Sequence, residues 1–363
     1  MTAANKHAVP TAAVLLVLAS WPAAAHADEA DLAERVDLSG DFRLRYESID
    51  RAGLPEQSRS RYRVRLNAGV DLYDDVRFVV SLATAADNPV SRNVTFGGNA
   101  LDDDFGVDLA YVQWRPRPDL DVFAGKMKNP MFAPGRDQLV YDNDLNPGGV
   151  AAAWAPGNWF VNAGAFAVEQ RSLTADTLLY HVQAGGDWRF SGVTLKAGAG
   201  YLVYTNTVGN TPFVFDLPAG NTVDAMNRYV YEYANVEAFA EFGAALGGLP
   251  LSVFAHYTEN VEVSREDAGL AVGLTLGEAR DAGSWEAGWT WKQVEADAVV
   301  GSFTESDFGG GGTDVEGHVF GGSYLLRDRL TLEATLFLNE AITFRDDARD
   351  YRRVQLDLQF EFD

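Results

Sequence analysis

The stretch Arg353-Val-Gln-Leu-Asp-Leu-Gln-Phe-Glu-Phe362 decides the fold, because polar and apolar residues alternate in it without a break. Successive side chains of a β-strand point to opposite faces, so this period of two predicts a strand with one apolar and one polar face. The same period recurs along the chain, in residues 36–47, 59–71, 193–204, 285–292 and 330–339. The sequence therefore predicts an all-β protein built from repeated two-faced strands.

The connections between these strands fall into two classes by length. The short turns are residues 73–75, 115–119, 156–158, 190–192, 247–250, 279–283 and 327–329. The longer, mostly polar loops are residues 48–58, 87–104, 128–149, 169–176, 205–228, 260–267, 297–315 and 344–350. Short turns at one end and longer loops at the other are typical of an up-and-down barrel in an outer membrane, here of about sixteen strands.

No segment beyond the N-terminal region has the length of continuous apolar sequence that a membrane-spanning helix needs. Lipid otherwise admits only a closed barrel, because every backbone polar group must be paired there. We therefore expect residues 28–363 to form a transmembrane antiparallel up-and-down β-barrel. An even number of strands and the position of the short turns predict that both termini face the periplasm.

The first residues have the pattern of a secretory signal peptide. Lys6 precedes an apolar stretch over residues 8–25, and Ala25-His26-Ala27 gives a small-x-small cleavage site. The alternative is an N-terminal anchor helix, but Pro10 and Pro22 interrupt the stretch. We expect residues 1–27 to be removed after export through the inner membrane of a Gram-negative cell.

The position of the last strand predicts a role in assembly. Outer-membrane barrels commonly end in such a strand with a terminal aromatic residue, which the barrel assembly machinery reads. Phe360 and Phe362 are the candidates for this signal, although Asp363 follows them.

Several motifs in order along the chain carry a resemblance to a known family. They are Ser58-Arg-Ser-Arg-Tyr-Arg-Val-Arg-Leu66, Lys126-Met-Lys-Asn-Pro130, Tyr141-Asp-Asn-Asp-Leu-Asn-Pro-Gly-Gly149, Gly311-Gly-Thr-Asp-Val-Glu-Gly-His318 and Tyr351-Arg-Arg-Val-Gln-Leu-Asp-Leu358. In these stretches the chain resembles the putative-porin family of proteobacterial outer membranes. The resemblance implies a large single-chain barrel with porin-like function and implies no particular solute.

Arginines with a period of two form a ladder on one predicted strand. The ladder is Arg59, Arg61, Arg63 and Arg65, and Arg43 and Arg45 have the same polarity on the neighbouring strand. An arginine on the lipid face costs about 2–4 kcal/mol at the bilayer midplane, so the ladder must face the lumen. The side chains either attract anions at a constriction or are structural charges paired with carboxylates, and both can hold together.

The loop of residues 128–149 is the third long loop of the predicted barrel. It contains Arg136, Asp137, Asp142 and Asp144, and prolines stiffen it. General porins fold their third external loop into the barrel, so this loop is a candidate constriction loop. The alternative is a solvated surface loop.

Composition narrows the other classes of function. The net charge of −23 argues against binding of nucleic acid, which needs clustered positive charge. The chain has no cysteine. His181, His256 and His318 lack metal-ligand spacing, and neither a Gly-x-Ser-x-Gly motif nor a phosphate loop occurs. The acidic clusters 102–104 and 346–350 are weak calcium candidates beside the alternative of solvated loops. We expect no enzyme, no cofactor and no metal site.

These observations predict an outer-membrane porin that allows passive diffusion of small hydrophilic solutes and ions through a charged, water-filled pore. One alternative is a channel specific for an anionic saccharide or organic acid, for which Tyr229, Tyr231 and Tyr233 are the candidate stacking residues in the lumen. Another is a non-conducting structural or adhesive barrel. The expected partners are membrane lipid, the assembly machinery and the solutes, and a homotrimer is common among general porins.

Overall fold

The computed structural model describes residues 35–85, 87–97, 103–172, 174–342 and 350–363. The expected signal peptide at residues 1–27 lies outside these residues, as do Asp102, Asp346 and Asp347 of the acidic clusters. In the described part of the chain no helix has the length and apolar character to cross a membrane.

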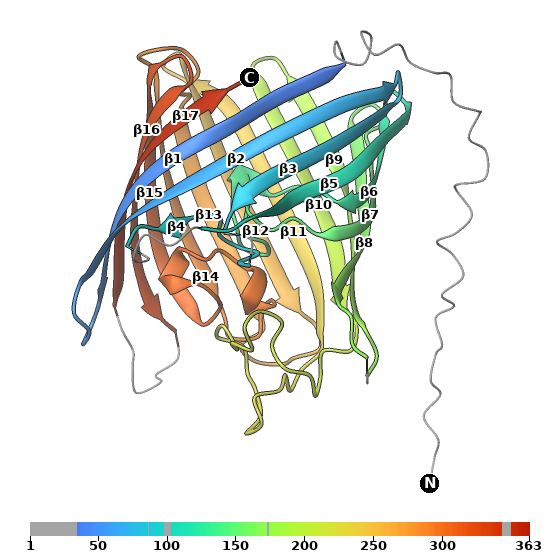
Figure 1. Cartoon of the computed structure of the whole chain (residues 1–363), viewed down its shortest axis with the longest axis vertical. Helices are drawn as coiled ribbons and strands as arrows, with labels where there is room; N and C mark the ends of the chain where they lie inside the picture. The colour runs from blue at the N-terminus through green and yellow to red at the C-terminus, as the bar shows by residue number, and fades with distance from the viewer. Residues whose placement is uncertain (1–34, 86, 98–102, 173, 343–349) are drawn as a thin grey trace.

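The described residues form a closed antiparallel β-barrel (Figure 1). Sixteen strands make the wall, and β1 pairs with both β2 and β17 to close it: β1 (Val36–Arg51), β2 (Gln57–Tyr73), β3 (Val76–Thr84), β5 (Phe105–Arg117), β6 (Leu120–Lys126), β7 (Gly148–Trp154), β8 (Trp159–Glu169), β9 (Thr177–Phe190), β10 (Val193–Tyr204), β11 (Tyr233–Leu246), β12 (Leu249–Asn260), β13 (Ala268–Gly277), β14 (Trp285–Val294), β15 (Val315–Arg327), β16 (Leu330–Ala341) and β17 (Tyr351–Phe362). The predicted fold class and strand number are confirmed.

The strands expose their apolar side chains and bury their polar ones, the reverse of the arrangement in a soluble protein. On β17, Leu356 and Phe360 are exposed, whereas Arg353, Gln355 and Asp357 are buried. The alternation therefore turns apolar side chains outward, toward lipid, and polar side chains into the barrel, where they pair with one another. Phe362, the other candidate of the assembly signal, is also exposed on the outer face.

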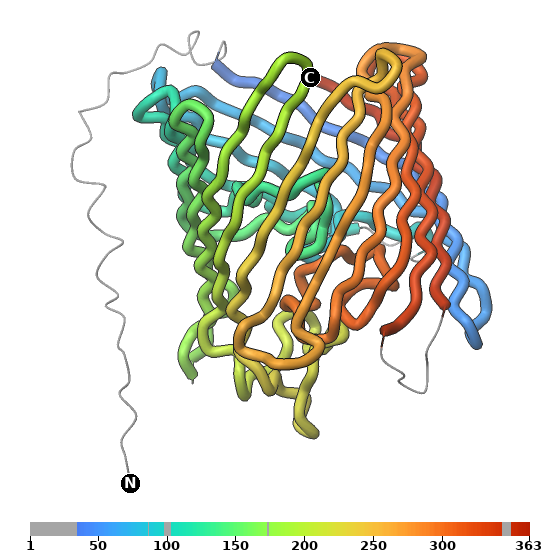
Figure 2. Tube along the Cα trace, turned by 180° about the vertical axis from the view of Figure 1, so that it is seen from behind, coloured from blue at the N-terminus to red at the C-terminus, as the bar shows by residue number. Residues whose placement is uncertain are grey.

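The connections are short at one end of the barrel and long at the other. Figure 2 shows the loops gathered at the lower end, with the loop between β10 and β11 projecting furthest, and the C-terminus at the end of the short turns. All seven predicted turns lie between strands of the structure. The sides of the membrane that these two ends face stay a prediction.

Two predicted loop boundaries were wrong. The loop predicted at residues 48–58 is only residues 52–56, because β1 and β2 continue to pair as far as Ile49 and Gln57. Polar residues occupy both faces of this extension, so the period of two is lost while the backbone ladder continues. The loop predicted at residues 87–104 contains the two-residue strand β4 (Val94–Thr95), which pairs with β2 where the shorter β3 leaves its edge open.

Candidate pore constriction

Six arginines form one wall of the barrel interior, which we call the arginine wall: Arg43, Arg45, Arg59, Arg61, Arg63 and Arg65. The register of β1 against β2 places Arg43 opposite Arg63 and Arg45 opposite Arg61. Like charges directly opposite each other in a sheet are destabilising, so this wall needs carboxylates close by.

The strands themselves supply three of these carboxylates. Asp357 lies opposite Arg45 on β17 and accepts two hydrogen bonds from its guanidinium, at 2.7 and 2.6 Å. Glu47 is fully buried and pairs with Arg59, Arg61 and also Arg353 of β17; Asp41 accepts from Arg63 Nε at 2.9 Å. These residues lie on the same alternating face as the arginines, so the period of two already contained the signal for them.

Arg43 is the member of the wall with the weakest charge compensation. Its guanidinium donates to the neutral amide oxygen of Asn93 at 2.7 Å, and the Asp357 carboxylate is 3.8 Å away. Its Nε has no hydrogen-bond partner within the described residues. Arg43 therefore remains able to interact with an anion in the lumen.

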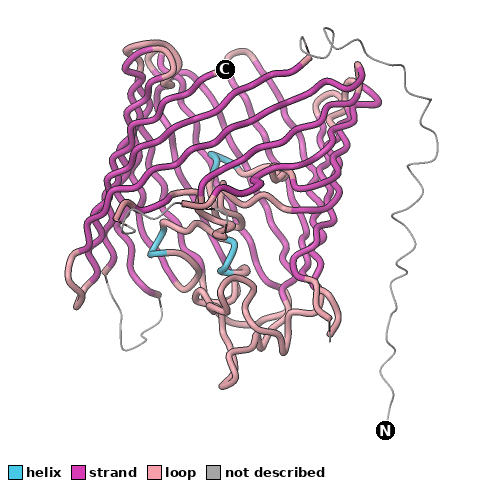
Figure 3. Tube along the Cα trace, viewed as in Figure 1, coloured by secondary structure: helices cyan, strands magenta, loops and turns pink. Residues whose placement is uncertain are grey.

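The connection between β6 and β7, residues 127–147, lies inside the barrel; we call it the third loop. Its backbone and side chains contact the wall opposite the arginines: Phe132 N–H donates to Gln183 at 2.7 Å, Gly135 N–H to Glu241 at 2.7 Å, and Asp137 pairs with His256 at 3.0 Å. Figure 3 shows the short helical turns in the interior of the barrel. These contacts join polar groups of the loop to polar side chains of the strands that face the lumen. Such side chains therefore hold the loop in place.

The third loop also reaches the arginine wall. Asp144 pairs with Arg65 and accepts from the backbone N–H of Arg92. Asp142 does not touch an arginine and instead accepts from the backbone N–H of Asp144 and of Ser306, at 2.8 and 2.9 Å. Arg136 is largely exposed and lies 3.9 Å from Glu286, so it belongs to the opposite side of the lumen.

A second inward loop went unnoticed in the sequence. Residues 295–314, between β14 and β15, form what we call the seventh loop, and its Asp307 contacts Arg45, Arg353 and Gln355 at 3.1, 2.8 and 2.9 Å. Irregular loops carry no periodicity, so the sequence offered no signal that Asp307 faces β1 and β17.

Burial and neighbouring charge shift the pKa of the loop carboxylates in opposite directions. Burial raises the pKa of Asp142 to about 8, and the carboxylate of Asp144 acts in the same direction. Burial is the largest single influence on Asp144 and Asp307 and opposes their ionisation. The surrounding positive charges, with Arg65 foremost at Asp144 and Arg353 at Asp307, together outweigh burial and lower both pKa values. Asp144 and Asp307 are therefore fixed negative charges against the arginine wall.

A cavity of about 600 Å³ remains between the wall and the loops. Arg43, Arg45, Arg63 and Arg65 line one side of it, and Asp144 and Asp307 are also part of its lining. Arg136, Asp142 and Glu305 line it as well, so nine ionisable side chains of the described residues border the space at the level where the loops narrow the barrel.

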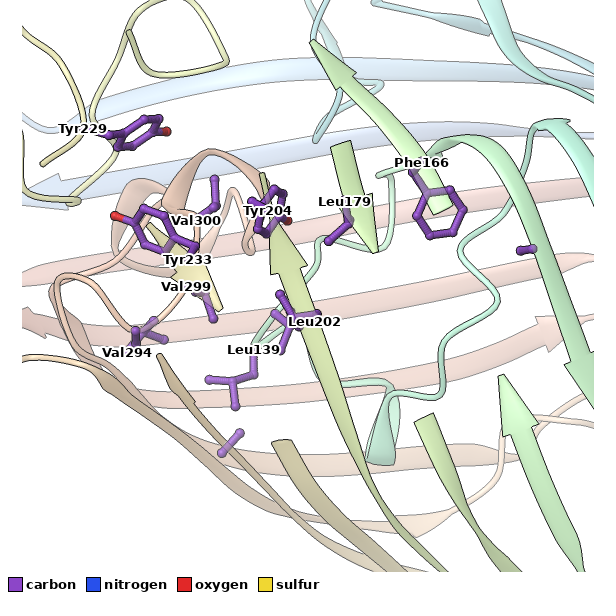
Figure 4. Packing of buried hydrophobic residues seen from close by; sticks show 14 of the residues in the cluster. Leu139, Phe166, Leu179, Leu202, Tyr204, Tyr229, Tyr233, Val294, Val299 and Val300 are labelled. Atoms are coloured by element: carbon purple, nitrogen blue, oxygen red, sulfur yellow. The ribbon is translucent and has the colours of Figure 1, made fainter. Parts of the chain in front are cut away.

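An apolar cluster packs in another part of the interior. Figure 4 shows Tyr204, Tyr229, Tyr233, Val299 and Val300 packed together, from β10, the loop before β11, β11 and the seventh loop. The hypothesis that Tyr229 and Tyr233 form a stacking track on the lumen was wrong, since they are about 1% and 0% exposed. Tyr231 lies on no strand, because β11 begins only at Tyr233.

Two buried histidines, His181 and His256, link the third loop to the barrel wall. His181 and His256 both contact Glu237, at 2.9 and 3.3 Å, and each also contacts the third loop, through Tyr141 and Asp137. In the described residues no group of three or more His, Asp or Glu side chains is placed so that it could hold a metal ion. This network anchors the third loop to β9, β11 and β12.

The sequence model of a family described as putative porin matches residues 51–234 and 222–362, which together span nearly the whole barrel. The chain belongs to this family. No curated protein matches the sequence.

Solved structures share the fold. OprB of Pseudomonas putida, in its high-pH structure, has a TM-score of 0.63 at 14% identity, covering 91% of this chain and 95% of that one. OmpF of Salmonella typhi, in complex with daunomycin, has a TM-score of 0.57 at 11% identity, covering 90% and 97%. OmpT of Vibrio cholerae, an outer membrane protein in a loop-deletion mutant, has a TM-score of 0.53 at 14% identity, covering 90% and 99%. Family and fold together make this porin-family chain an outer-membrane channel for passive diffusion.

Proposed function

We propose that small hydrophilic solutes and ions diffuse through this channel past a charged constriction made by the arginine wall and the inward loops. The cavity of about 600 Å³ beside the wall carries this proposal. Its lining is charged, which favours water over a dry packed core, and the apolar cluster confines the open path to the arginine side. In this proposal the chain performs no enzymatic step and uses no cofactor.

The width of the pore and the electric field inside it would select the solutes. The third and seventh loops set the width, and the arginines with Asp144 and Asp307 set the local field. Asp144 and Asp307 each contact an arginine directly, so the opposite charges largely cancel at a distance. The electric field is therefore strong near the arginine wall and weak further away. Salt screens what remains, with a Debye length of about 10 Å at 0.1 M.

A second candidate is a channel specific for an anionic saccharide or organic acid. The observation that favours it is the group of four arginines lining one cavity, Arg43, Arg45, Arg63 and Arg65. Guanidinium groups pair with carboxylates in a bidentate manner, so an anionic solute would be retained there.

Single-channel recording of the refolded full-length protein in a planar bilayer tests the proposal. A diffusion porin gives steps of current that rise in proportion to KCl concentration and are not saturated by one solute. Saturation by a single anionic solute would favour the specific channel. A folded barrel without any current would overturn the proposal in favour of a structural or adhesive role.

The proposal also covers how the chain is exported and how it is assembled in the outer membrane. Cleavage of the signal peptide at residues 1–27 predicts that protein isolated from the outer membrane begins at Asp28, which N-terminal sequencing checks. Insertion by the barrel assembly machinery and a homotrimeric state are also part of it. Native mass measurement in detergent checks the trimer, which should have three times the mass of the mature chain, itself smaller than the 39.5 kDa of the full chain.

A further inference from the structure

The side chain of Asp307 occupies a cradle of three donors on the barrel wall, which we call the Asp307 cradle. Arg45 Nη1 and Gln355 Nε2 donate to Asp307 Oδ2 at 3.1 and 2.9 Å, and Arg353 Nη2 lies 2.8 Å from Oδ1. Both oxygens of one carboxylate are therefore engaged by two guanidinium groups and an amide, an arrangement that selects a planar, charged carboxylate.

The donors of the cradle are held in place by other residues. Asp357 fixes Arg45 through two hydrogen bonds at 2.7 and 2.6 Å. Glu47 binds Arg353 and also accepts from Gln355 at 3.3 Å. The cradle thus keeps its shape when the Asp307 carboxylate leaves it, and a preorganised site binds a replacement without a new ordering cost.

The neighbouring residues allow the Asp307 side chain to leave while the loop stays. Phe308 is about 1% exposed and packs against Ile49, Phe337 and Tyr351, which anchors the backbone at this point. The side chain of Asp307 is 22% exposed, and Asp307, Arg45 and Gln355 all line the cavity of the lumen. A change of side-chain rotamer would therefore bring the carboxylate from the cradle into the water of the lumen without a movement of the backbone.

The charge balance around the cradle favours exchange for another anion over an empty site. Within the described residues, the arginines of this group outnumber the carboxylates paired with them: Arg43, Arg45, Arg59, Arg61, Arg63, Arg65 and Arg353 against Asp41, Glu47, Asp144, Asp307 and Asp357. An incoming carboxylate restores the charge that Asp307 withdraws, whereas a neutral solute leaves Arg45 and Arg353 with Asp357 and Glu47 as their remaining carboxylate partners among the described residues.

We propose that the cradle of Arg45, Arg353 and Gln355 is a binding site for the carboxylate group of a solute, and that Asp307 is its intramolecular competitor. A carboxylate solute in the cavity displaces Asp307, binds to the same donors and is released when Asp307 returns. The inference rests on the proposed channel function and adds to it a ligand class and a site.

Competition by Asp307 predicts how its removal changes binding. Asp307→Asn keeps the size of the side chain and removes the charge that holds it in the cradle. If Asp307 occupies the cradle nine-tenths of the time, the variant binds a solute carboxylate about tenfold more tightly. We expect the benzoate concentration that halves the KCl current of the full-length channel to fall about tenfold relative to the wild type.

Matched variants and probes separate the site from a general field effect. Glu305→Gln removes one negative charge from the same loop, but Glu305 pairs with Lys292 outside the cradle. The benzoate concentration that halves the current of this variant should therefore stay at the wild-type value. Benzamide, which has the shape of benzoate without its charge, should not block Asp307→Asn. Adding Gln355→Leu to Asp307→Asn should restore weak benzoate block.

Each contrary outcome overturns the inference while leaving the channel function in place, because the KCl current is measured first. An unchanged benzoate block in Asp307→Asn overturns it, as does an equal gain in Glu305→Gln. Equal block by benzamide, or tighter block by phenylphosphonate than by benzoate, overturns the assignment to carboxylates. Absence of any KCl current in the wild type would overturn the channel function itself.

Discussion

At the scale of single residues, the arginine wall is stable because each charge faces the lumen and meets a counter-ion or an amide. Arg45, Arg61 and Arg63 pair with carboxylates on the strands, whereas Arg65 depends on Asp144 of the third loop. The arginines are therefore structural partners of carboxylates, and four of the six also border the cavity. Attraction of anions at a constriction, the other interpretation of the sequence, stays a prediction. The net effect of the arginines on ions depends on how much positive charge is left uncompensated.

Replacing Arg61, Arg63 and Arg65 by Gln should shift the reversal potential toward greater cation preference. The change keeps length and polarity but leaves Glu47, Asp41 and Asp144 with fewer cationic partners, so the lumen becomes more negative. The shift should be larger in dilute salt than in concentrated salt. An unaltered reversal potential in a folded, conducting variant would mean that the current passes away from this wall.

Asp142 predicts a pH dependence of stability with a definite sign. Its pKa in the folded chain is about 8, above the ordinary value near 4, so the folded chain holds a proton that the unfolded chain has lost between these pH values. Stability should therefore fall as pH rises from about 4 to 8 and level off above that. Thermal unfolding of Asp142→Asn, a neutral side chain of equal size, should show a smaller fall; an identical pH profile for both proteins would contradict the assignment.

At the scale of elements, strands and loops follow different rules. Each strand is specified locally by its own alternation, and the register with its neighbours brings the arginines of β1 and β2 opposite one another. The third and seventh loops are specified by contacts with distant strands, such as Asp137 with His256 and Asp307 with Arg353. Insertion of the strands and placement of the loops should therefore respond to different mutations.

The last strand supplies the test of insertion. Phe360→Asp combined with Phe362→Asp places two charges on the lipid face of β17, where both aromatics are exposed. We expect accumulation in the outer membrane to be lost, because each charge is unfavourable in lipid and the proposed assembly signal is removed. Heat-modifiable mobility on gels measures the folded barrel, and Gln359→Asn on the same strand is the control. Normal levels of folded barrel in the double variant would refute the role in assembly.

At the scale of the whole molecule, the barrel has one end of short turns and one end of loops, and its interior is divided. The apolar cluster around Tyr204, Tyr229 and Tyr233 fills one side, and the charged cavity occupies the other. In the proposed function, solutes that cross the membrane pass along the arginine wall. The orientation of the barrel decides which end receives them.

The absence of cysteine from the chain allows this orientation to be tested with single substitutions. Met226, in the loop between β10 and β11, is 63% exposed, and Asp328 lies in the short turn between β15 and β16. If both termini face the periplasm, Met226→Cys should react with a membrane-impermeant maleimide on intact cells, and Asp328→Cys only after the outer membrane is broken. The reverse pattern of labelling would invert the topology.

The alternation of polar and apolar residues was enough to predict the barrel, the strand number and the face on which the arginines lie. Alternation is local, and the cost of an arginine in lipid fixes which face turns inward without knowledge of any neighbour. For the same reason the partnership of Glu47 and Asp41 with the wall was readable, since they share the face of Arg43 and Arg45.

The contacts that fill the lumen could not be predicted from local sequence and became visible in the folded chain. Asp307 meets Arg45 across 262 positions of sequence, and Tyr233 packs against the seventh loop instead of facing the pore. Loops have no periodic pattern, and their contacts depend on barrel closure and on the relative lengths of the strands. The Asp307 cradle therefore exists only after the closing pair β1–β17 brings Arg45, Arg353 and Gln355 side by side beneath the seventh loop.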